Sequence, residues 1–374
     1  MTLATLPKYG EFEVSVFGPG RGECILVHMG YNEWCMIDSC VARGRSLPAA
    51  VEYLNGLGQA ALDGVLLVLA THWHDDHIGG IATSLRAFPN AQFACSTALG
   101  KPQFLTLVQL QRKSLQGDSG VDEFGEVIEI LRERKLLGVS PARATTVWAV
   151  QDRRLLHREQ SGRAFSATVT ALSPSDVAVQ LALNKIAGLV PQPNQPQSRI
   201  TNRPPNEASV VLLIEVGDRR ALFGADLEHS GQEGEGWLAI LNSSQTPRVP
   251  AKVYKIPHHG SLNADLPEVW EKLLDPDPIA ILTPFTSGRG LPQPRDLLRL
   301  QGRTSNLYCT AEPRAKLPKH DDKVVEKKLK DRKRIAIDGK LGHVRLRWSA
   351  TDATAAPQVE LFNGAYKVRA EGQS

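Results

Sequence analysis

Four potential metal ligands lie within six residues of this sequence: His72, His74, Asp76 and His77. They follow the continuous apolar run 64–70, which predicts a strand covered on both faces. A Gly-Gly pair follows them after Ile78. Neutral imidazoles bind Zn, Mn or Fe, and a carboxylate among them hardens the site and adds charge. Alternation puts the first two histidines on one side of an extended segment, while the other two ligands enter from the next helix. One loop can therefore serve two metal positions.

Three further groups of polar residues follow predicted strands. Asp38 ends the strand 34–37, Asp226 follows the strand 220–224, and His258 and His259 follow the strand 252–256. In open α/β arrangements, sites form where strand ends meet loops. We therefore expect these side chains to converge with the histidine-rich loop on one metal centre.

The spacing of these residues resembles that of metallo-β-lactamase-fold hydrolases. The resemblance rests on the His-x-His-x-Asp-His signature at 72–77, with Asp38 as the early aspartate, Asp226 as the bridging aspartate and His258 as the late histidine. It implies two divalent metal ions. We expect the first metal to be held by His72, His74 and Asp226, and the second by Asp76, His77, Asp226 and His258.

Within that superfamily the sequence resembles the hydrolase domain of bacterial DNA-uptake channels of the ComEC type. The motifs that carry this likeness are Asn206 before Ser209-Val-Val, Gly224-Ala-Asp226 and His258-His-Gly-Ser261. The resemblance covers roughly 11–310 and is weak over 100–190. A histidine that completes the first site in many members has no counterpart here, and the Gly-His-Pro after the late motif is Gly-Leu-Pro at 290–292.

The expected mechanism uses two metals about 3.5–4 Å apart, which can hold a bridging hydroxide and clamp both oxygens of an in-line displacement. Asp76 belongs to this catalytic set, and Asp38 orients a ligand imidazole from behind. His259 either contacts the substrate or protonates the leaving group, or else it packs beside the metal loop. The metals are Zn²⁺ or Mn²⁺, because a first site without its third histidine favours oxygen and water ligands.

Substrate contacts are predicted for three residues near these motifs: Asn206, Lys255 and Ser261. Lys255 can face a phosphate, although a lysine on a strand is more often simply solvated. The other histidines, such as His28 in an apolar strand, are expected to be structural.

The fold class that positions this centre is α/β, namely the four-layer αββα sandwich of the resemblance. Strands are predicted over 11–38, 64–70, 209–224, 252–256 and 279–282, and helices over 46–58 and 81–88. One hydrolase domain then spans 1–312, with a helical surface insertion over about 101–165 and a Pro-rich loop at 188–206. A basic C-terminal extension, 313–374, packs on this domain or completes it, with a closing strand pair at 343–348 and 358–362.

Composition limits the setting and the partners. The net charge of +4 averages a body near −4 and a segment, 314–347, that has 13 Lys/Arg against 5 Asp/Glu. Five scattered cysteines predict reduced thiols, and no apolar run approaches the roughly 20 residues of a membrane span. We therefore expect a cytoplasmic protein without a membrane partner. No Gly-x-Ser-x-Gly, Walker loop or Rossmann fingerprint is present, which argues against serine-nucleophile and nucleotide-cofactor chemistry.

Three functions fit these patterns. A phosphodiesterase or nuclease acting on nucleic acid or nucleotides is favoured by the two-metal motifs and the basic segment, although that segment can also be a solvated helix face. A lactone, thioester or amide hydrolase would use the same metals on a small molecule. A partner-gated component of a defence or toxin assembly, with a protein partner from the same operon, is the third hypothesis.

Overall fold

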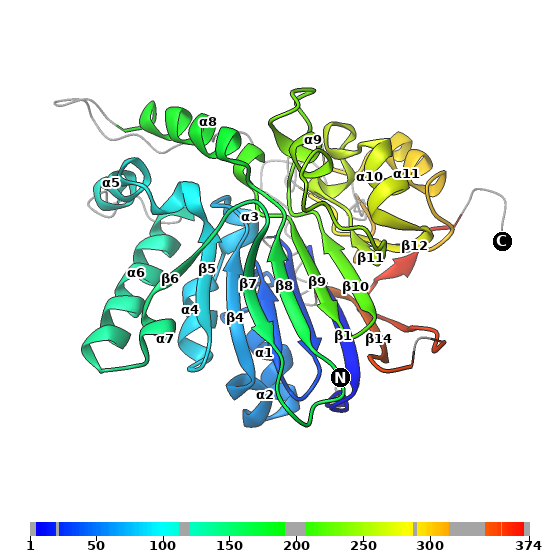
Figure 1. Ribbon diagram of the computed structural model, residues 1–374, viewed down its shortest axis with the longest axis horizontal. Helices are drawn as coiled ribbons and strands as arrows, with labels where there is room; N and C mark the ends of the chain where they lie inside the picture. The colour runs from blue at the N-terminus through cyan, green and yellow to red at the C-terminus, as the bar shows by residue number, and fades with distance from the viewer. Residues whose placement is uncertain are drawn as a thin grey trace, which may run out of the picture.

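A computed structural model of the protein describes residues 5–19, 22–111, 120–190, 206–286, 290–313, 341–352 and 354–369. Within these residues the strands form two mixed sheets that lie one in front of the other in Figure 1. The first sheet has the order β15 (Gln358–Phe362), β14 (Gly342–Ser349), β1 (Glu11–Gly18), β2 (Cys24–Met29), β3 (Trp34–Ile37), β4 (Val65–Ala70), β5 (Gln92–Ser96), β6 (Thr146–Ala149). The second has the order β16 (Tyr366–Lys367), β13 (Leu307–Cys309), β12 (Leu274–Leu282), β11 (Ala251–Lys255), β10 (Arg219–Phe223), β9 (Leu212–Val216), β8 (Ala167–Ala171), β7 (Arg153–Arg158).

Helices cover the outer face of each sheet. Apolar side chains of the first sheet pack against α1 (Ala49–Leu57), α2 (Gln59–Asp63), α4 (Ile81–Ala87), α5 (Pro102–Gln111) and α6 (Gly120–Leu136). Those of the second sheet pack against α9 (Gly236–Leu241), α10 (Pro267–Leu273) and α11 (Pro294–Gln301). The two groups of helices lie on opposite sides of the sheets in Figure 1. The predicted four-layer αββα sandwich is therefore confirmed.

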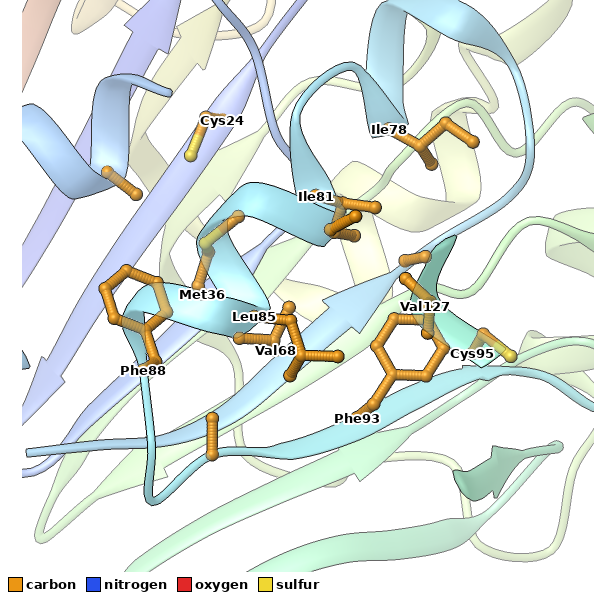
Figure 2. Close-up of a cluster of buried hydrophobic side chains, with 14 of the residues drawn as sticks. Cys24, Met36, Val68, Ile78, Ile81, Leu85, Phe88, Phe93, Cys95 and Val127 are labelled. Carbon is orange, nitrogen blue, oxygen red and sulfur yellow. The ribbon is translucent and has the colours of Figure 1, made fainter. Parts of the chain in front are cut away.

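Alternation along the strands builds two separate cores from one sheet. In β4, Leu67 and Leu69 face the second sheet, whereas Val68 faces the helices. Figure 2 shows Val68 together with Leu85 of α4 and with Phe88 and Phe93. Both faces of the strand are covered, which explains why its sequence is continuously apolar rather than alternating.

The segment predicted as a surface insertion, 101–165, is instead part of the sandwich. Helix α6 buries Phe124, Val127 and Ile130 in the core against α4 and α5. Its Arg134 is also buried and donates hydrogen bonds to the backbone oxygens of Leu85, Phe88, Ala91 and Arg143. The short helix α7 (Pro141–Ala144) then leads into β6 and β7, the edge strands of the two sheets. The segment is helical as predicted, but it completes layers rather than decorating them.

The described part of the C-terminal extension adds strands to both sheets. Strand β14 pairs antiparallel with β1 from Glu11↔Ser349 to Gly18↔Gly342, and it pairs antiparallel with β15, which confirms the closing strand pair. Strand β16 pairs with β13 in the second sheet. The basic stretch 314–340 and the Pro-rich stretch 191–205 lie outside the described residues.

All five cysteines are buried free thiols, as predicted. Burial raises the pKa of the Cys35 thiol to about 12, so this thiol stays protonated. Within the described ranges, no helix has both the length and the hydrophobicity needed to cross a membrane.

We expect the stability of the protein to fall as the pH drops from 7 to 5, in part because of His28. This imidazole is fully buried; Nδ1 donates to the Glu11 carbonyl oxygen at 2.9 Å, and Nε2 accepts from the Asn32 backbone N–H at 3.1 Å. Only the neutral ring can do both, and burial lowers the pKa of His28 to about 4. The unfolded chain therefore binds the extra proton below pH 6.5, and about 2 kcal/mol of stability is lost by pH 5. Urea unfolding at both pH values measures this loss, and His28→Gln should lose correspondingly less; equal losses in both proteins would contradict the assignment.

Candidate metal centre

The predicted site residues meet at one edge of the two sheets. Strands β3 and β4 are parallel, as are β10 and β11, so the carboxyl ends within each pair lie side by side. Asp38 follows β3, and the histidine-rich loop with α3 (Asp75–Ile78) follows β4. Asp226 follows β10, and the 3₁₀ turn η3 (His258–Gly260) follows β11. In Figure 1, α3 lies at this edge, at the opposite end of the strands from α2.

Asp76, His77, Asp226 and His259 form the tightest group in the centre, with one potential ligand atom from each lying within 4.8 Å of the others. His77 Nε2 is 3.3 Å from Asp226 Oδ1, and His259 Nε2 is 3.4 Å from Asp76 Oδ2. The group is buried except for the partly exposed Asp76. Two imidazoles and two carboxylates therefore face one common point.

His72 and His74 form a second group beside it. Their ring centroids are 4.6 Å apart, and His72 Nε2 lies 3.9 Å from Asp226 Oδ2. The same Asp226 oxygen is 3.9 Å from His259 Nε2. Asp226 thus lies between the two groups, with an oxygen near an imidazole of each.

Hydrogen bonds behind the centre orient its imidazoles. His77 Nδ1 donates to Asp38 Oδ2 at 2.7 Å. The Thr71 hydroxyl donates to the same Asp38 oxygen at 2.7 Å and lies 2.9 Å from His72 Nδ1, which donates to it. With both Nδ1 atoms engaged in this way, the Nε2 lone pairs of His72 and His77 are directed at the centre. Asp38 therefore orients two imidazoles, consistent with the positioning role predicted for it.

The His258-His259 pair is placed in the reverse of the predicted sense. His259 is buried, its Nδ1 donates to the Thr283 carbonyl oxygen at 2.8 Å, and its Nε2 joins the metal group. His258 instead lies with Nδ1 3.2 Å from Glu228 Oε1, partly exposed and outside that group. The cause is the turn itself, because both histidines have left-handed φ values, 44° and 53°. His259, and not His258, therefore belongs to the group of potential metal ligands.

The donor set fits divalent cations. His72 Nε2, His77 Nε2, His259 Nε2 and Asp226 Oδ1 are all buried without a hydrogen-bond partner in the described part of the chain. Buried polar atoms are normally satisfied, and four unsatisfied ones aimed at one region match the ligands of a metal. Nitrogen and carboxylate oxygen together suit Zn²⁺ or Mn²⁺.

Charges in the metal-free centre balance one another. Burial acts to lower the pKa of His77, but the carboxylates of Asp226 and Asp38 more than offset it and hold that pKa well above its usual range. Burial acts to raise the pKa of Asp226, yet the imidazoles of His77 and His259 hold it well below its usual range. The pKa of His72 is lowered, first by burial and then by His77 and His74. In the metal-free centre the carboxylate of Asp226 is therefore ionised and the imidazole of His77 is protonated. The proton on His77 supplies positive charge that a bound cation would otherwise supply.

Replacing Asp38 by asparagine should weaken metal binding by about 10- to 100-fold, the usual effect of losing a residue that orients a metal ligand. Both Asp38 oxygens accept hydrogen bonds, Oδ1 from the Thr71 backbone N–H and Oδ2 from His77 Nδ1, so the amide nitrogen faces a donor whichever way it turns. The dissociation constant for Zn²⁺, measured by competition with a chromophoric chelator, tests this. Thr71→Ser is the matched control, because it keeps the hydroxyl between Asp38 and His72. Unchanged affinity in Asp38→Asn would contradict the orienting role.

The residues predicted to contact substrate differ in their surroundings. Lys255 is 1% exposed, with Nζ 2.8 Å from Glu23 Oε2 and donating to the Ile256 carbonyl oxygen, so it is neither solvated nor open to a phosphate. Asn206 lies at the edge of a pocket beside His72 and His74. Ser261 is partly exposed in the turn after η3, where its backbone N–H donates to the His258 carbonyl oxygen.

Sequence reasoning missed four residues that support the centre. Thr71 bridges Asp38 and His72, Thr283 holds His259, and Glu23 lies within 4.8 Å of Asp38 and His77. Glu228 accepts a hydrogen bond from Asn206 Nδ2, and its Oε1 lies 3.2 Å from His258 Nδ1. Only Thr71 and Glu228, each adjacent to a motif, could have been suspected from their position. The missing third histidine has no spatial substitute in His157, which lies on β7 and bonds Thr168.

Part of this chain is similar to known proteins. A family model described as the metallo-beta-lactamase superfamily matches residues 17–152, and no curated protein matches the chain. The metallo-β-lactamase fold protein YhfI from Bacillus subtilis is 12% identical, with a TM-score of 0.29, covering 59% of this chain and 64% of that one. A B3 metallo-β-lactamase with an active-site glutamic acid is 17% identical, with a TM-score of 0.31 and coverages of 60% and 65%. A mutant of the CmlA β-hydroxylase is 16% identical, with a TM-score of 0.33 and coverages of 65% and 35%.

The chain spans less than two thirds of the length of each of these three structures. The family model and the two helix-flanked sheets together show the metallo-β-lactamase fold.

Proposed function

We propose that this chain, with its metallo-β-lactamase fold, is a metal-dependent hydrolase that cleaves phosphodiester bonds of nucleic acid or nucleotides. The observation that carries the proposal is the position of Asp226. Its Oδ1 lies 3.3 Å from His77 Nε2, and its Oδ2 lies 3.9 Å from both His72 Nε2 and His259 Nε2. One carboxylate can therefore serve two neighbouring cations.

The residues present would hold two cations in adjacent positions. His72 and His74 would hold one, Asp76, His77 and His259 the other, and Asp226 both. Bound there, divalent cations supply Lewis acidity that polarises a phosphoryl group and makes water a stronger acid. The chain's own part is orientation: Asp38 and Thr283 accept the Nδ1 hydrogen bonds of His77 and His259, so that their Nε2 atoms face the proposed cation positions.

A phosphodiester is favoured over a carbonyl substrate by two features of the sequence. The stretch 314–347 has 13 Lys/Arg against 5 Asp/Glu, a local charge suited to a phosphate backbone. The order Asn206, Asp226, His258-His-Gly-Ser261 is the one for which the sequence resembles ComEC-type domains. Both features support the nucleic-acid or nucleotide class over a lactone, thioester or amide.

The test is hydrolysis by the full chain loaded with Zn²⁺ or Mn²⁺. We expect cleavage of bis-p-nitrophenyl phosphate and of single-stranded oligonucleotides, with a loss of more than about 100-fold in Asp226→Asn, because a direct ligand must matter more than a residue behind one. Oligonucleotide binding should also weaken steeply as salt rises. Turnover of p-nitrophenyl acetate or a lactone, combined with none of the phosphodiesters, would replace the proposal with a carbonyl hydrolase.

A further inference from the structure

A pocket opens beside His72 and His74, and both histidines line it. It has an empty volume of about 340 Å³, counted with the part open to solvent. Its walls come from the 3₁₀ turns η1 (Thr97–Gly100) and η2 (Asn206–Ala208) and from α8 (Asp176–Ala187), which lies above the strand ends near α5 in Figure 1. The apolar part of the lining consists of Trp73, Ala98, Leu99, Ala182, Ile186 and Ala208.

Three polar residues interrupt this apolar lining: Ser96, Asn206 and Ser209. Each is at least nine-tenths buried, with exposed fractions of 1%, 7% and 0%. The Ser96 and Ser209 hydroxyls and Asn206 Oδ1 have no hydrogen-bond partner among the described residues. Buried polar atoms are rarely left in this state, so three of them in one apolar pocket point to a ligand that supplies the missing partners.

The amide of Asn206 is fixed in one orientation by Glu228. Asn206 Nδ2 donates to Glu228 Oε1 at 3.0 Å, and the other oxygen of this carboxylate accepts from Asn263 Nδ2 at 2.7 Å. A carboxylate only accepts, so the amide NH₂ of Asn206 must face it. Asn206 therefore presents Oδ1, a pure acceptor. His258, with Nδ1 3.2 Å from Glu228 Oε1, ties this arrangement to the turn that places His259.

Backbone hydrogen bonds also hold the pocket close to the metal centre. The Val210 backbone N–H donates to the Thr71 carbonyl oxygen at 3.0 Å, which holds Ser209 beside the loop that begins at His72. Ser96 ends β5, which pairs in parallel with β4, the strand that leads into the same loop. The described lining contains no Lys, Arg, Asp or Glu. A charged phosphate thus belongs at the metals, and the pocket suits an uncharged neighbour of it.

Resting on the function proposed above, we propose that this pocket holds a nucleobase of the substrate, with a base N–H donating to Asn206 Oδ1. A base has apolar faces for the Trp73, Leu99 and Ile186 side of the pocket and a polar edge for Asn206 and the two serines. A simple alkyl or acyl group would leave all three polar atoms without partners. The pocket thus selects nucleotide substrates over other phosphodiesters.

The test compares three p-nitrophenyl phosphodiesters that share one leaving group: the 5′-ester of thymidine, that of N3-methylthymidine, and ethyl p-nitrophenyl phosphate. We expect the metal-loaded protein to prefer the thymidine ester. In Asn206→Leu, kcat/KM for that ester should fall by about 10- to 100-fold, as for one lost buried hydrogen bond. Its kcat/KM for the ethyl ester should fall by a smaller factor, so that the variant loses the preference for the thymidine ester. Methylation of N3 should cause a similar loss in the unaltered protein and no further loss in the variant.

A second variant tests the pocket without changing Asn206 or its hydrogen bond to Glu228. Ala182→Phe fills the pocket from α8, and Val177→Phe, at a half-exposed position on the same helix, is its matched control. Only the first should reduce kcat/KM for the thymidine ester relative to the ethyl ester. Equal effects on both esters in Asn206→Leu and Ala182→Phe would overturn the nucleobase assignment while leaving the phosphodiesterase intact. Absence of ethyl ester hydrolysis by the unaltered, metal-loaded protein would instead contradict the proposed function itself.

Discussion

Replacing His259 by alanine is expected to remove one metal ion per chain and to lower phosphodiester hydrolysis by more than about 100-fold. His259 is buried, its Nδ1 is held by the Thr283 carbonyl oxygen, and its Nε2 has no partner in the described residues other than the metal group. It contributes one of the two imidazoles at the Asp76 side of the centre. Loss of a direct ligand should exceed the 10- to 100-fold effect of losing a residue that orients one.

His258→Ala is the matched control, since it removes an adjacent imidazole from the same turn. His258 lies outside the metal group with Nδ1 near Glu228, so this variant should keep its full metal content. Metal content by mass spectrometry, together with steady-state kinetics on bis-p-nitrophenyl phosphate, separates the two histidines. A metal loss in His258→Ala with none in His259→Ala would restore the assignment made from the sequence.

Most of the centre could be predicted because its residues follow strands. A motif at the carboxyl end of a buried parallel strand is placed by the sheet, not by its own loop. The histidine-rich loop after β4, Asp38 after β3 and Asp226 after β10 all follow this rule. Their convergence needed no knowledge of side-chain packing.

The order of the two late histidines could not be predicted in the same way. Neighbouring side chains point in different directions, and which of them faces the metals depends on the backbone of a three-residue turn. Here His258 and His259 both adopt left-handed φ values, 44° and 53°. Such values are uncommon for residues other than glycine, and a His-His-Gly sequence does not predict them.

The role of 101–165 was misjudged for a different reason. Helix α6 has many charges, which suggested a surface insertion, but its apolar residues recur at helical spacing. Val121, Phe124, Val127, Ile130 and Leu131 are all buried. The 3.6-residue period was therefore the better guide. The buried Arg134, which joins α6 to four backbone oxygens, has no such periodic signal.

The second large expected effect concerns stability: Lys255→Met should destabilise the metal-free protein by about 3–5 kcal/mol. Lys255 and Glu23 are each 1% exposed, and Lys255 Nζ lies 2.8 Å from Glu23 Oε2. Glu23 begins the segment that leads into β2 in the first sheet, and Lys255 ends β11 in the second. Without the ammonium group, Glu23 is a buried carboxylate that lies close to a second carboxylate, Asp38, and has lost the cation 2.8 Å from it.

The free energy of unfolding in urea, measured with EDTA present so that metal binding does not contribute, tests this expectation. Lys252→Met is the matched control, because Lys252 is an exposed lysine on the same strand and should change stability by less than about 0.5 kcal/mol. The double variant Glu23→Gln, Lys255→Met should recover most of the loss, since removing both charges of a buried pair is often neutral. A lysine that contacted substrate phosphate would give the opposite pattern, with unchanged stability and a raised KM in Lys255→Met. That result would show that the buried ion pair does not hold the two sheets together beneath the metal centre.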